Sequence, residues 1–134
     1  MHVPTRPTLL SLSLIAVACL AACDDAPSPL VRDDATVALL KRADPDRGRQ
    51  LIVEKGCVAC HVVPQVPSPV SNVGPALDNV GRQAYLSGLL PNTPANLVRW
   101  LLDPPAVNPR TAMPNVGLTR TQAEDVAAFL ITLP

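Results

Sequence analysis

The chain has 134 residues, a length that suits one domain of ordinary size and is short for two. It carries 11 basic and 11 acidic residues, so it lacks the basic excess with which proteins replace the counterions of nucleic acids. A nucleic-acid partner is therefore not expected. Aromatic residues make up only 2% of the chain. Either aliphatic side chains build the core, or a non-protein group fills part of it.

The N-terminal segment has the pattern of an export signal. Arg6 precedes a mostly apolar run of 15 residues, which is too short to span a membrane comfortably, because a span needs about 20 residues. We expect residues 1–22 to be a signal peptide. The run ends in Leu-Ala-Ala-Cys at residues 20–23, which resembles the lipobox of bacterial lipoproteins. This resemblance implies cleavage before Cys23 and acylation of that residue; an ordinary cut after Ala18 or an uncleaved anchor are the alternatives.

Residues 23–43 have the composition of a flexible tether. They contain Pro27 and Pro29, mixed charges and no strong core pattern, apart from Ala-Leu-Leu at 38–40, which can form one short helical turn. About 20 flexible residues have an average span of about 25 Å. Such a tether would let a lipid-anchored head reach the exposed surface of a partner.

Residues 44–134 predict one all-α domain. An N-cap residue followed by proline opens a helix at 44–55 and another at 93–103. Thr119 with Gln122 forms a capping-box pattern that opens a last helix. The stretch 62–81 is rich in Pro, Ser, Asn and Gly and predicts loop, and no strand alternation is visible.

The motif Cys-Val-Ala-Cys-His at residues 57–61 is the attachment pattern of haem c. Thiols at Cys57 and Cys60 can reach the two vinyl groups of one porphyrin, and His61 then places its imidazole over the iron. A structural zinc site needs four Cys or His ligands, and the predicted domain has three. A thioredoxin-like site needs a βαβ setting, which is not visible, and a plain disulfide would leave the histidine unexplained. We predict one covalent haem c.

The second axial ligand is predicted by elimination. Met1 and His2 lie in the predicted signal peptide, so the mature chain contains one further methionine, Met113, in a proline-rich loop. His/Met ligation raises the reduction potential of a haem relative to harder ligand sets. The ordinary role of a lone methionine is core filling. Lys41, Lys55 or an open coordination site are the other possibilities.

At this point residues 44–133 resemble a class I c-type cytochrome. The resemblance is strongest to the cytochrome c domains fused to subunit II of some bacterial haem–copper oxidases, through residues 90–97 and 99–100. It implies the class I cytochrome c fold, in which the first and last helices cross and close over the haem. It also implies that Gly48 of the first helix lets Phe129 of the last helix cross closely.

The resemblance implies roles for four further residues. The carbonyl of Pro75 would accept the proton of the haem-binding histidine, a bond that fixes the orientation of an imidazole. Arg82 and Thr111 would bind the haem propionates, and Trp100 would lie against the haem on the methionine side. The alternatives are a solvated surface for Arg82, an ordinary turn for Thr111 and simple core packing for Trp100.

The function that follows from the resemblance is one-electron transfer without a catalytic acid, base or nucleophile. The expected donor is a cytochrome bc complex or a dehydrogenase and the expected acceptor a terminal oxidase, at the outer face of the bacterial cytoplasmic membrane. Steering by charge is not expected, because Lys41 and Lys55 are the only lysines. A haem subunit permanently docked in a larger oxidoreductase, and a ligand-binding or peroxidatic haem protein in which Met113 leaves the iron, are the alternatives.

Overall fold

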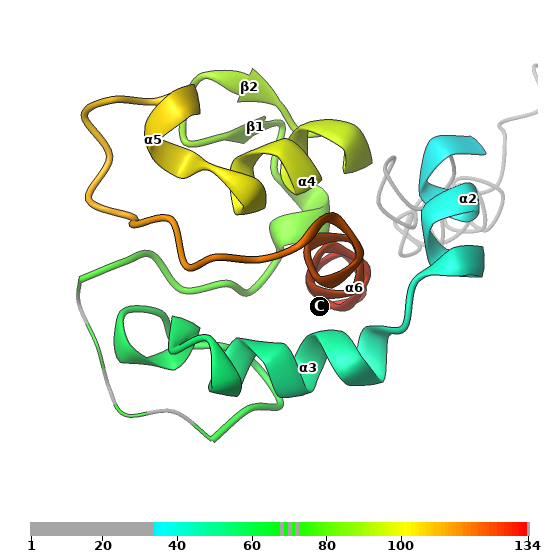
Figure 1. The fold of residues 1–134 in the computed structure, drawn as a ribbon, viewed down its shortest axis with the longest axis horizontal. Coiled ribbons are helices and arrows are strands. Elements are labelled where there is room, and N and C mark those ends of the chain that lie inside the picture. The colour runs from blue at the N-terminus through cyan, green and yellow to red at the C-terminus, as the bar shows by residue number, and fades with distance from the viewer. Residues whose placement is uncertain (1–33, 68, 70, 72, 134) are drawn as a thin grey trace, which may run out of the picture.

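The computed structural model describes residues 34–67, 69, 71 and 73–133 (Figure 1). The predicted signal peptide, Cys23 and the first half of the predicted tether lie outside these residues. In the part of the chain that is described, no helix is long and apolar enough to cross a membrane.

Two crossing helices form the centre of the fold. Helix α3 (Pro45–Glu54) passes beneath α6 (Arg120–Ile131), which is seen nearly end-on in Figure 1. Both begin where the sequence predicts, because the Asp44 side chain accepts the Arg47 N–H at 3.0 Å and Thr119 forms the expected capping box with Gln122. The second half of α6, from Val126 to Ile131, is entirely buried and supplies much of the core.

The crossing of α3 and α6 depends on Gly48. A Cβ atom at this position would strike the carbonyl oxygen of Asp125 and lie 2.5 Å from its carbonyl carbon. Only glycine lets the two helix backbones approach this closely. The three atoms nearest the Cβ position belong to the Asp125 and Val126 backbones, so the close approach at Gly48 is one between helix backbones. Phe129, on the same helix, is buried in the core, and its pairing with Gly48 stays a prediction.

The segment between the crossing helices contains short elements. The 3₁₀ turns η2 (Cys57–Ala59) and η3 (Val80–Arg82) are followed by a hairpin of β1 (Tyr85–Leu86) and β2 (Leu90–Pro91), and then by α4 (Pro94–Leu102) and α5 (Pro104–Val107). The antiparallel hairpin was not expected, because strands of two residues are too short to show an alternating pattern. Helix α5 lies where the sequence predicts a loop; the Asp103 side chain caps it by accepting the Ala106 N–H at 3.3 Å.

Helix α2 (Asp34–Arg42) replaces the second half of the predicted tether. It packs against α4 and α6 and buries Thr36 and Leu39, which are 0% and 1% exposed. Two nitrogens of Arg42 each lie 3.2 Å from the carboxylate of Glu124 on α6. A helix this short is marginal alone and is stabilised by tertiary packing, which a local pattern does not reveal.

Candidate functional site

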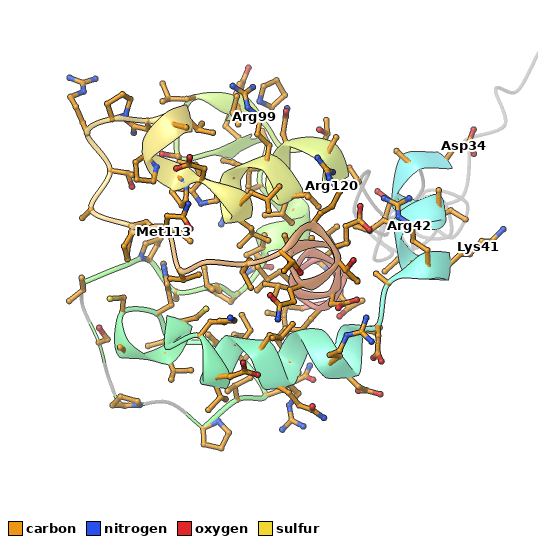
Figure 2. The ribbon with its side chains drawn as sticks, in the orientation of Figure 1. Asp34, Lys41, Arg42, Arg99, Met113 and Arg120 are labelled. Atoms are coloured by element: carbon orange, nitrogen blue, oxygen red, sulfur yellow. The ribbon has the colours of Figure 1, made fainter. Side chains whose placement is uncertain are left out.

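A cavity of about 370 Å³ lies between η2, the segment 73–77, α4, α6 and the loop that joins α5 to α6. Much of its wall is aliphatic. Figure 2 shows Met113 on that loop, on the opposite side of the molecule from Asp34 and Lys41 of α2. The cavity brings together all but one of the predicted haem-binding residues: Cys57, Cys60, His61, Pro75, Trp100, Thr111 and Met113.

The CxxCH motif forms a tight turn at one wall of this cavity. Gly56 has φ +74° and reverses the chain after α3, which few other residues do without strain. The N–H groups of Cys60 and His61 both donate to the Cys57 carbonyl, at 3.2 and 2.9 Å. The two cysteines are not joined by a disulfide, and burial raises the pKa of the Cys57 thiol. The turn therefore places both sulfurs and the imidazole on one cavity wall.

The loop that follows the motif contacts the imidazole of His61 at its Nδ1 atom. This atom lies 2.7 Å from the carbonyl oxygen of Pro75, as the resemblance implies. The Gly74 N–H donates to the Cys60 carbonyl at 2.9 Å, which keeps the loop against the motif. With Nδ1 protonated and bonded to a carbonyl, Nε2 carries the lone pair that can bind a metal.

Gly74, directly before Pro75, is a further residue of this site. A Cβ atom there would lie 2.5 Å from Cε1, 2.7 Å from Nδ1 and 3.0 Å from Nε2 of His61. The ring therefore packs directly on the backbone of residue 74. The glycine immediately before Pro75 is the feature of the sequence from which this close packing could have been predicted.

The remaining predicted residues divide into two groups. Met113 and Trp100 are half-buried, line the cavity and also pack against the core, while the contact of Trp100 with a haem stays a prediction. Thr111 lines the cavity too, and its hydroxyl accepts the Met113 N–H at 3.1 Å, which shapes the turn before the methionine. Arg82 is exposed and is absent from the cavity wall, so its contact with a propionate stays a prediction.

The donors that meet in this cavity fit a haem. Two thiols can form thioethers, while an imidazole and a thioether sulfur are an axial pair used for haem iron. The aliphatic wall suits a large apolar ring. Among residues 34–67, 69, 71 and 73–133, no group of three or more His, Cys, Asp or Glu side chains could hold a metal by itself.

Comparison with known proteins agrees with the geometry. The family described as cytochrome c matches residues 45–134, well over half of the chain. Cytochrome c oxidase subunit 2 of Alkalihalophilus pseudofirmus is 30% identical over 89 residues, which are 66% of this chain and 25% of the relative. The chain thus spans about a quarter of that protein's length. From its family match and its Cys-x-x-Cys-His site, the chain belongs to the cytochrome c family, whose members bind covalent haem c and transfer electrons.

Proposed function

We propose that the protein is a membrane-tethered electron carrier with His/Met-ligated haem. Thioethers from Cys57 and Cys60 would hold the porphyrin, and His61 and Met113 would bind its iron. The observation that carries this proposal is that His61 and Met113 line the same apolar cavity, with the His61 Nδ1 atom already bonded to the Pro75 carbonyl. That bond leaves Nε2 as the metal-binding nitrogen.

When bound, the haem supplies an iron that changes between the ferrous and ferric states. The chain contributes ligands that are held in place and an apolar surrounding that excludes water. Pro75 keeps the Nδ1 proton of His61 in place, and this bond tunes the basicity of the imidazole. Aliphatic side chains such as Ile52, Leu97 and Leu130 line the cavity and exclude water. A hydrophobic shell of this kind controls the reduction potential.

The proposed setting is the outer face of the bacterial cytoplasmic membrane. Residues 1–22 would be removed as a signal peptide and Cys23 would carry the lipid. Electrons would pass from a cytochrome bc complex or a dehydrogenase to a terminal oxidase; the similarity to an oxidase subunit supports that acceptor. Because α2 is packed on the domain, only residues 23–33 separate it from the lipid, and 11 residues reach at most about 40 Å.

Replacement of the proposed methionine ligand tests the haem assignment. We expect Met113→Ala to keep the covalent haem, lower the reduction potential and abolish the red absorption band of the sulfur–iron bond, because thioether sulfur favours ferrous iron. The matched control is Val116→Ala, which shortens another half-buried side chain of the cavity wall without removing a ligand. A Met113→Ala protein that keeps both the potential and the red band would refute the assignment.

Fractionation and mass spectrometry test the anchor. Wild-type protein should sediment with membranes and resist washing in high salt, because ions do not screen the burial of acyl chains. Cys23→Ser should release a haem protein with the same spectrum or accumulate as the precursor. An intact mass that corresponds to an unmodified N-terminus would show that the carrier has no lipid.

A further inference from the structure

Asn108 connects the methionine loop to its surroundings through all four of its polar groups. Its N–H donates to the Pro104 carbonyl at 2.9 Å and ends α5, and its carbonyl accepts the Thr111 N–H at 2.9 Å. In the side chain, Oδ1 accepts the Arg110 N–H at 3.1 Å and Nδ2 donates to Ser87 Oγ at 3.3 Å. The first three bonds are local, whereas the fourth reaches a residue 21 positions earlier in the chain.

The position of Ser87, which accepts this fourth bond, is set by the hairpin that carries it. It lies in the turn between β1 and β2, where its φ of +51° and that of Gly88 at +68° place the backbone in the left-handed region. The side chain of Asn92 holds the hairpin to η3, since its Nδ2 donates to the Val80 carbonyl at 2.6 Å and to the Gln83 carbonyl at 2.9 Å. Ser87 and Gln83 both line the cavity.

A short path of bonds runs from this hairpin to the proposed ligand. Ser87 holds Asn108, the Asn108 carbonyl holds the Thr111 N–H, and the Thr111 hydroxyl accepts the Met113 N–H at 3.1 Å. We propose that Asn108 is a positioning residue for Met113, which keeps the loop where the methionine sulfur stays on the iron. This inference rests on the proposed ligation by Met113.

Imidazole binding to the ferric protein measures this effect directly. External imidazole binds only after the sulfur has left, so its apparent affinity rises in proportion to the population of open iron. We expect Asn108→Ala to bind imidazole about tenfold more tightly than wild type and to show a weaker red band. A tenfold change corresponds to about 1.4 kcal/mol, close to the value of one side-chain hydrogen bond.

Three further single variants and one double variant separate positioning from general weakening of the loop. Asn108→Asp should stay within about twofold of wild type, because one carboxylate oxygen can still accept the Arg110 N–H and the other can accept the Ser87 hydroxyl. Ser87→Ala should shift the affinity in the same direction as Asn108→Ala, and the double variant should add little. Asn115→Ala is the matched control, since among the described residues its Oδ1 accepts only the Gly117 N–H, at 2.8 Å in a local turn after Met113.

The outcomes distinguish this inference from the proposed function. If Met113→Ala leaves imidazole affinity unchanged, Met113 is not the ligand and the proposed function fails. If Met113→Ala tightens binding but Asn108→Ala and Ser87→Ala stay within twofold of wild type, only the inference about Asn108 is overturned. An Asn115→Ala effect as large as that of Asn108→Ala would also overturn it, and Ser87→Ala decides the matter if Asn108→Ala fails to fold.

Discussion

Replacing Gly74 by alanine tests how tightly the chain holds its haem-binding histidine. The new Cβ would lie 2.5 Å from Cε1 of the His61 ring, whereas carbon atoms pack at about 3.5–4.0 Å, so the two must separate by about 1 Å. The thioethers of the neighbouring cysteines would keep the His61 ring in place. The loop that carries Pro75 would therefore move, and the 2.7 Å bond from its carbonyl to Nδ1 would lengthen or break.

Two contributions set the expected fall in the free energy of unfolding. Overpacking costs about 1–3 kcal/mol and the lost hydrogen bond about 1 kcal/mol, so the free energy of unfolding should fall by about 2–4 kcal/mol. In a domain of this size that lowers the midpoint of thermal unfolding by at least about 8 °C. The weaker bond also makes the imidazole less basic, which disfavours ferric iron. A differential effect of about 1 kcal/mol raises the reduction potential by about 40 mV.

Thermal unfolding followed by circular dichroism and an equilibrium redox titration of the haem-loaded protein would measure these changes. Gly88→Ala is the matched control, because φ at Gly88 is +68° and no atom of the described part of the chain lies within 4 Å of its Cβ position. That variant should lose only about 1–2 kcal/mol from backbone strain and keep its potential. Equal thermal midpoints and equal reduction potentials for Gly74→Ala and Gly88→Ala would refute the close packing of the His61 ring on residue 74.

Four further variants test the parts of the fold around the site. Leu39→Ala should lower the free energy of unfolding in denaturant titrations by about 2–5 kcal/mol, because Leu39 is 1% exposed; a loss below about 0.5 kcal/mol would mean that α2 contributes nothing to the folded unit. Asp125→Asn should lower the thermal midpoint more than Glu124→Gln, since the Asp125 carboxylate is fully buried whereas the Glu124 carboxylate is partly exposed; equal effects would contradict this ranking. A Cys57→Ala/Cys60→Ala double variant should yield a poorly folded apoprotein, because the cavity loses its apolar filling; a cooperative and stable unfolding transition without haem would show that the polypeptide core suffices.

The features that could be predicted from the sequence are those set by residues within a few positions of one another. The caps at Asp44, Thr93 and Thr119 each bond a backbone N–H three residues on, and the structure confirms all three. The spacing of the two cysteines and the histidine likewise predicted covalent haem c, and in the structure this motif forms a 3₁₀ turn. Such contacts depend little on the rest of the chain.

Contacts between distant residues were decided by the tertiary structure. Arg42 on α2 meets Glu124 across 82 positions, Gly48 packs on the Asp125 backbone, and Asn108 reaches the hairpin across 21 positions. Neither α2 nor the hairpin shows a strong local pattern, because each depends on the surface it packs against. The local sequence determined which groups could bind haem, whereas the crossing of α3 and α6 and the packing around it decided where those groups meet, since burial and close approach depend on all the elements at once.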